Sequence, residues 1–86
     1  MYKAIFSHKA EKSLQKIPRE YQKRIKESIL KLEENPFCFG TIKLVGYPVA
    51  QYRHRVGDYR ILFDLWDQKK ILMILDIRRR TSTTYS

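Results

Sequence analysis

Two kinds of hydrophobic spacing divide the chain. In the first half, apolar residues recur every three or four positions, which is typical of amphipathic helices. A short apolar strand over residues 2–7 comes first, and Ser7 is placed to cap the helix that follows. The spacing predicts one helix from about His8 to Ile17 and a second from Pro18, which suits a first helical turn, to about Glu34.

In the second half, apolar and polar residues alternate, which is typical of strands. A connection with a Pro and a Gly, residues 35–40, separates the two halves. Gln51 to Val56 predicts one strand, Gly57-Asp58 a type II′ reversal, and Tyr59 to Trp66 the return strand. After a break, the apolar run from Ile71 to Ile77 predicts a central strand buried on both faces over much of its length.

The order of these elements, β-α-α-β-β-β, predicts an α+β fold in which a helical hairpin packs on one face of a mostly antiparallel sheet. With 86 residues, the chain has room for one core, so residues 1–86 are expected to form a single domain. Two helices cover only one face of such a sheet. The other face is therefore expected to be open to a ligand or a partner.

Several arginines are expected on that open face. Alternation places Arg53 and Arg55 on the same side of one strand, and Arg60 lies on the next strand, about 4.8 Å away. The last strand ends in three further arginines, residues 78–80. Like charges at such spacing repel, and the planar guanidinium suits phosphate, so an anion is expected among them. The alternative is that each arginine is an ordinary solvated surface residue.

The overall charge supports an anionic partner. Eighteen Lys and Arg against nine Asp and Glu give a net charge of +9, which suits nucleic acid, an anionic membrane or an acidic protein. No apolar run approaches the roughly 20 residues of a membrane span, so a cytoplasmic location without membrane contact is expected. The single cysteine, Cys38, has no partner for a disulfide, and the histidines and carboxylates lack metal-ligand spacing. No metal or cofactor is expected.

Two further side chains have alternative interpretations. Tyr85 follows a polar run, where a base-stacking ring beside cations and a frayed terminus are both consistent with the sequence. His54 shares a strand face with Tyr52 and Val56, which favours a packed histidine over a catalytic base.

Three segments together resemble one family: KLVG (43–46), YRHRVGDYRILF (52–63) and ILDIRRRTSTTY (74–85). They are similar to segments of the RelE/ParE superfamily of toxins of type II toxin-antitoxin systems, and of its RelE branch in particular. The resemblance implies a ribosome-dependent endoribonuclease that cuts mRNA in the A site, needs no metal, and is neutralised by a cognate antitoxin. An antitoxin segment with an amphipathic helix and acidic residues is the expected partner.

The resemblance also implies roles for individual residues. It assigns catalysis to Arg53, Arg55, Arg60, Arg79 and Tyr85, and RNA binding to Lys43, Arg78 and Arg80. In such toxins the 2′-hydroxyl attacks the adjacent phosphorus and leaves a 2′,3′-cyclic phosphate and a 5′-hydroxyl. Arg53, Arg55 and Arg60 would stabilise the developing charge, Arg79 would assist the leaving oxygen, and Tyr85 would position a base.

One departure and two alternatives stay open at the level of sequence. Relatives often have lysine where this chain has Arg53. Arginine keeps its proton at neutral pH and is a poor general base, so the acceptor of the 2′-hydroxyl proton is not assigned.

The first alternative function is a ParE-like inhibitor of DNA gyrase. The second is an RNA-binding module without catalysis, whose affinity would fall with salt. The retained cations and Tyr85 favour the nuclease.

Overall fold

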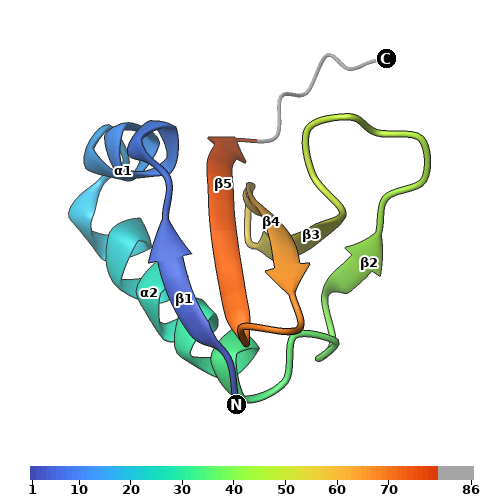
Figure 1. Ribbon diagram of the computed structural model, residues 1–86. Coiled ribbons are helices and arrows are strands. Elements are labelled where there is room, and N and C mark those ends of the chain that lie inside the picture. Colours follow the sequence, from blue (N-terminus) through green and yellow to red (C-terminus); the bar gives the residue numbers. More distant parts are fainter. Residues whose placement is uncertain (80–86) are drawn as a thin grey trace.

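The computed structural model describes residues 1–79 and contains two helices packed against one face of a five-stranded sheet (Figure 1). The elements are β1 (Lys3–Phe6), α1 (His8–Gln15), α2 (Arg19–Glu34), β2 (Thr41–Lys43), β3 (Tyr52–Val56), β4 (Tyr59–Trp66) and β5 (Ile71–Arg79). In the sheet, the strands follow the order β1-β5-β4-β3-β2, with β1 parallel to β5 and the other neighbours antiparallel. The predicted α+β class and helical hairpin are confirmed.

Local signals explain most element ends. Ser7 caps α1 by accepting a hydrogen bond from the Ala10 N–H at 3.0 Å. Helix α1 ends at Gln15 and not at the predicted Ile17, because the residue before a proline is disfavoured in helical conformation. Gly57 has a φ of 57°, and it is the one residue of the two-residue reversal with a positive φ, as the predicted type II′ turn requires.

Two features of the sheet differ from the prediction. Strand β2, which has three residues, was not predicted, and it adds an edge beside β3. Strand β5 lies between β1 and β4, as expected of a central strand, but only part of it is fully buried. On the side away from the helices, Met73 is half-buried and not enclosed.

The hydrophobic core lies between the helices and one face of the sheet. Helix α2 contributes Ile25 and Leu32, both fully buried, and β4 contributes Phe63 at its centre. The predicted apolar stripe of α2 is therefore the face that packs on the sheet. Strand register then assigns every residue of β3 and β4 either to this helix-packed face or to the opposite one, which we call the open face.

Candidate functional site

Three arginines form a row across the open face. Arg55 on β3 pairs with Arg60 on β4, and Arg60 pairs with Arg78 on β5. Because paired residues on neighbouring strands point to the same side, about 4.8 Å apart in backbone spacing, the three side chains share one face of the sheet. We call Arg55, Arg60 and Arg78 the guanidinium row.

Arg53 lies beside this row. It is two residues before Arg55 on β3, so it points to the same face, and it is half-buried. Arg55 is exposed, and its Nε donates to the Gly57 carbonyl at 3.3 Å. The structure thus brings together Arg53, Arg55 and Arg60 as predicted, on the side away from the two helices.

A β-bulge decides which arginine of β5 joins the row. Phe63 pairs with Ile74, but its neighbour Leu62 pairs with Asp76, so Leu75 is an extra residue on β5. One extra residue inverts the alternation beyond it. As a result, register places Asp76 and Arg78 on the same side of the sheet as Leu62 and Arg60. Asp76 is buried there against α1, whereas Arg78 is exposed.

The remaining predicted site residues lie elsewhere. Arg79 pairs with Tyr59, and Lys43 pairs with Tyr52. Register therefore places Arg79 and Lys43 on the helix-packed side of the sheet, where each is exposed at the margin of that face. The structure therefore does not bring Arg79 and Lys43 into the row. Arg80 and Tyr85 lie outside the described residues.

Arg78 is held at two points of its guanidinium group. Its Nε donates to Asp76 Oδ2 at 2.9 Å, and its Nη1 donates to the hydroxyl of Tyr47, in the β2–β3 loop, at 2.7 Å. The hydrogen bond to Asp76 raises the pKa of Arg78 above its ordinary value. Of the five N–H donors of a guanidinium, these two bonds use two, so three are left for a ligand.

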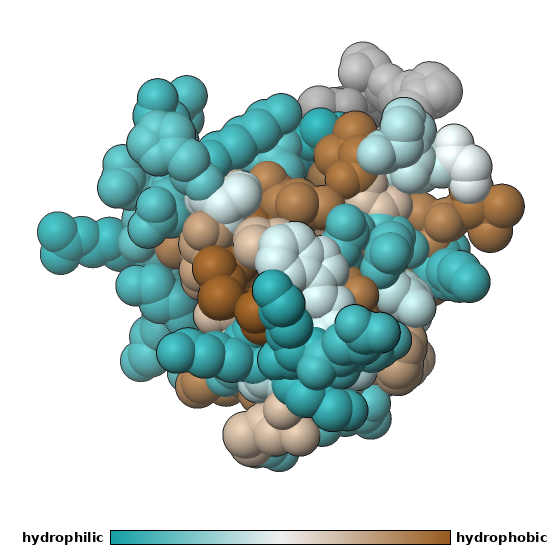
Figure 2. Space-filling view, viewed as in Figure 1, coloured by the Kyte–Doolittle hydropathy of each residue, from teal (hydrophilic) through white to brown (hydrophobic). Residues whose placement is uncertain are grey.

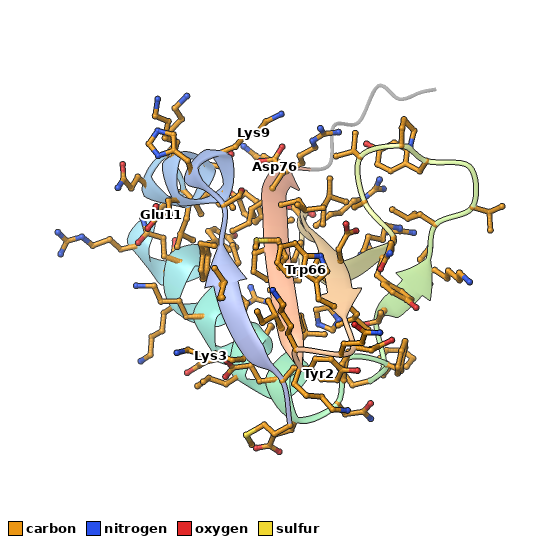
Figure 3. All side chains as sticks on the ribbon, viewed as in Figure 1. Tyr2, Lys3, Lys9, Glu11, Trp66 and Asp76 are labelled. Atoms are coloured by element: carbon orange, nitrogen blue, oxygen red, sulfur yellow. The ribbon has the colours of Figure 1, made fainter. Side chains whose placement is uncertain are left out.

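Asp76 is itself anchored in the fold. Its Oδ1 accepts from the Ser13 hydroxyl at 2.7 Å and from the Ile77 N–H at 2.8 Å, and Lys9 Nζ lies 3.7 Å from Oδ2. Figure 3 shows Lys9 beside Asp76 where α1 meets β5. Burial raises the pKa of the carboxyl, but these hydrogen bonds and charges outweigh burial and lower the pKa below its ordinary value. The carboxylate is therefore ionised and fixed in place.

Two residues of this site were not predicted from the sequence. The sequence does mark Asp76, because a carboxylate within the apolar run ILMILDI must find partners when the strand is buried. Tyr47 lies in the loop between β2 and β3, which has no hydrophobic periodicity, and only the folded chain shows its contact with Arg78.

The open face also carries exposed apolar side chains. Trp66, labelled near the centre of Figure 3, is 44% exposed, and Ile5 on β1 is 37% exposed. Figure 2 shows hydrophobic residues gathered over the middle of this view, with hydrophilic residues over α1 and α2. A ligand on this face would meet both charged and apolar surface.

His54 does not belong to the candidate site. It is buried on the helix-packed face, and its Nδ1 forms a 2.8 Å hydrogen bond with Thr41 Oγ1. Burial, with a smaller contribution from the charge of Lys31, lowers its pKa below the ordinary value. The prediction of a packed, hydrogen-bonded histidine is confirmed.

The described residues hold neither a metal site nor a membrane-spanning helix. Within residues 1–79, no three His, Cys, Asp or Glu side chains are grouped so as to hold a metal ion. Neither of the helices in that part of the chain is long and apolar enough to cross a membrane.

Sequence and structure comparisons place the chain among known toxins. A family model described as the ParE toxin of the type II toxin-antitoxin system parDE matches residues 4–83. The comparison with curated proteins gave no match. The archaeal RelE-RelB complex from Pyrococcus horikoshii contains a similar chain, with 30% identity and a TM-score of 0.80 over 95% of this chain and 98% of that one.

Two further structures share the fold. The toxin-antitoxin complex RelBE2 from Mycobacterium tuberculosis has a chain with 24% identity and a TM-score of 0.82, covering 92% of this chain and 98% of that one. The isolated RelE toxin from E. coli has 20% identity and a TM-score of 0.81, covering 96% of this chain and 88% of that one. At these identities, the likeness supports the fold alone.

Proposed function

Because this chain belongs to the RelE/ParE superfamily of toxins from type II toxin-antitoxin systems, we propose that it is a ribosome-dependent endoribonuclease. Its substrate is messenger RNA in the ribosomal A site, and cleavage inhibits translation in the cytoplasm. The observation that carries the proposal is the guanidinium row, with Arg53 beside it on the open face.

The row suits a phosphodiester that is being cleaved. Neighbouring guanidiniums repel one another when no anion is present, so their alignment favours an anionic ligand. Each guanidinium offers planar N–H donors that match phosphate oxygens. Donors fixed before the reaction stabilise charge that develops in the transition state, which is a large source of rate enhancement in enzymes.

The proposed reaction is an internal transfer at phosphorus. The RNA 2′-hydroxyl oxygen bonds to the adjacent phosphorus, and the bond from phosphorus to the 5′-oxygen breaks. The 2′-hydroxyl loses its proton to water and the leaving 5′-oxygen takes up one from water, so the products are a 2′,3′-cyclic phosphate and a 5′-hydroxyl with no net change in protons. Arg53, Arg55 and Arg60 stabilise the negative charge of the pentacoordinate intermediate, and no arginine acts as the base because a guanidinium keeps its proton.

The geometry changes one role in the proposal. Assistance to the leaving 5′-oxygen was expected from Arg79, but Arg78 is the residue that aligns with Arg60. We therefore place Arg78 next to the leaving oxygen and give Arg79 and Lys43 at most peripheral contacts with RNA. Base stacking by Tyr85 and RNA binding by Arg80 remain part of the proposal on the strength of the sequence resemblance.

Substitution of Arg60 tests the proposal. Arg60→Ala should lower the rate of mRNA cleavage in programmed ribosomes by about 10²- to 10³-fold, since it removes a central donor to the developing charge. Cleavage is measured by mapping RNA ends and assaying the cyclic phosphate. The matched control is Arg19→Ala, which removes the same charge at the exposed start of α2.

Three outcomes would count against the nuclease. If Arg60→Ala cleaves as fast as wild type while folded, the row is not the catalytic site. Binding of wild type to ribosomes without any cleavage would indicate a noncatalytic RNA-binding module. Equal losses in Arg60→Ala and Arg19→Ala would indicate a dependence on total charge and not on the row.

Inhibition of DNA gyrase is the second candidate function. It is favoured by the family match, which carries the ParE description. The guanidinium row favours RNA, because the resemblance associates these cations with the RelE-like nucleases and not with gyrase poisons. A supercoiling assay with purified gyrase separates the two, since the nuclease proposal requires that gyrase stays active.

A cognate antitoxin completes the proposal. Two of the similar chains were solved in toxin-antitoxin complexes, and the cationic open face of this chain needs masking while the toxin is stored. Trp66 and Ile5 offer apolar contacts on the same face. An antitoxin segment with an amphipathic helix and acidic residues fits this combination of surfaces.

A further inference from the structure

Arg78 differs from Arg55 in the row, because the protein holds its guanidinium at two nitrogens and that of Arg55 at one. Arg78 is 42% exposed at its side chain, yet two of its nitrogens are hydrogen-bonded, one to Asp76 and one to Tyr47. The two partners come from different parts of the chain, β5 and the β2–β3 loop. A guanidinium bonded at Nε and Nη1 cannot rotate without breaking one of these bonds.

The carboxylate that holds Arg78 does not move freely either. Asp76 has a side chain only 5% exposed, and Ser13 and the Ile77 N–H both bind its Oδ1. This arrangement leaves Oδ2 facing Arg78 and Lys9. The direction of Arg78 is therefore set through Asp76 by the packing of α1 on β5.

We infer that Asp76 and Tyr47 are positioning residues of the nuclease site, which aim the free N–H groups of Arg78 at the phosphate of the bound RNA. The inference rests on the proposed function. It adds two residues that do not touch the reacting atoms and that act only through Arg78.

Repulsion within the row explains why such positioning is needed. An unrestrained arginine beside Arg60 would turn toward solvent, because like charges repel and a long side chain has many rotamers. The Asp76 charge offsets part of this repulsion. Orientation set before RNA binds does not have to be established during the reaction, and misplacement of a catalytic group by about 1 Å can cost about 10²-fold in rate.

A double-mutant cycle tests the inference. Single-turnover cleavage of mRNA in programmed ribosomes is measured for wild type, Asp76→Asn, Arg78→Ala and the double variant. Asp76→Asn should slow the wild type by up to about 10²-fold and should have no further effect in the Arg78→Ala background. Equal slowing in both backgrounds would overturn the inference, because Asp76 would then act through the fold and not through Arg78.

A matched control and a second variant complete the cycle. Asp64→Asn changes another carboxylate on the open face, one that accepts from the Gln51 N–H, and it should leave the rate unchanged. If Asp76→Asn fails to fold, Tyr47→Phe takes its place, since Tyr47 is 39% exposed and its loss removes only the second hydrogen bond to Arg78. A rate for Tyr47→Phe equal to that of wild type would then overturn the inference.

A second measurement separates failure of the inference from failure of the proposed function. Exchange of the Arg78 Nε–H with solvent, followed by NMR, should be slow in the wild type and fast in Asp76→Asn. Fast exchange in a wild type that cleaves RNA would overturn the positioning role and leave the nuclease intact. Slow exchange in a wild type that cleaves nothing would overturn the nuclease, and the positioning role with it.

Discussion

Two polar side chains are buried in the part of the chain that the structure describes, His54 and Asp76, and each has partners that compensate for its burial. His54 is bonded to Thr41 on the neighbouring strand, whereas Asp76 receives bonds from Ser13, Ile77 and Arg78. The two environments favour opposite charge states. Burial lowers the pKa of His54 and keeps it neutral, whereas the hydrogen-bond partners of Asp76 lower the pKa of its carboxyl and keep it ionised. Both should therefore make stability depend on pH.

His54 predicts a loss of stability on mild acidification. Its folded pKa is lowered, so the unfolded chain takes up the proton first. The contribution of His54 is fully present above the unfolded value of about 6.5 and is lost as pH falls from there through the lower folded pKa. Urea unfolding at a series of pH values should show this fall in the wild type and a weaker one in His54→Gln.

His8 provides the control for this measurement. It is the other of the two histidines and is exposed, so His8→Gln should retain the fall in stability. If His8→Gln removes the fall, or if His54→Gln retains all of it, burial of His54 is not its cause.

Ser7 joins three elements. It caps α1 through the Ala10 N–H, and its own hydroxyl donates to the Leu75 carbonyl of β5 at 2.9 Å, at the point where β1 ends. Since Leu75 is the extra residue of the bulge, the bond gives its carbonyl a partner. Ser7 therefore helps to hold the part of β5 that leads to Asp76 and Arg78.

Ser7→Ala should lower the free energy of unfolding by about 1 to 2 kcal/mol, about 1 for the lost cap and the rest for the lost bond to Leu75. Chemical denaturation measures the change. Ser28→Ala, a substitution inside α2, should cost little, because alanine is the better helix former there. Equal stability of Ser7→Ala and wild type would show that the cap contributes nothing.

Most helices and strands could be predicted from the sequence, because the spacing of their apolar residues can be read from a short stretch of the chain. The two helices, the hairpin of β3 and β4, and the last strand all follow from periods that a short window reveals. Strand β2 could not be predicted, since its three residues form a strand only by pairing with β3. The same holds for the parallel contact of β1 with β5, which joins distant segments.

Because of the bulge, the alternation of side chains along β5 does not predict which arginine lies on the open face. Alternation along β3 correctly puts Arg53 and Arg55 on one face, since β3 and β4 pair without interruption. On β5, uninterrupted alternation would send Arg79 to the open face and Arg78 to the helix-packed face. The extra residue Leu75 reverses this outcome, and nothing in the run ILMILDI marks its position.

Across the whole molecule, one face of the sheet forms the core and the other carries the proposed site. One face and the helices enclose the core, while the open face combines the guanidinium row with exposed apolar side chains. The β1 edge of the sheet is closed to strand addition near its centre, because Glu33 Oε2 accepts from the Ala4 N–H at 2.7 Å. The open face is thus the surface that we propose for both RNA and antitoxin.

Arg78 and Arg79 are adjacent in sequence but lie on opposite faces of β5, so substituting each in turn tests whether the guanidinium row is the catalytic site. The measurement is the single-turnover rate of mRNA cleavage in programmed ribosomes for Arg78→Ala and Arg79→Ala, two variants that lose the same charge. We predict that Arg78→Ala is about 10²-fold or more slower than wild type, whereas Arg79→Ala stays close to the wild-type rate. Equal rates in the two variants, or a larger loss in Arg79→Ala, would contradict the assignment of the guanidinium row as the catalytic site.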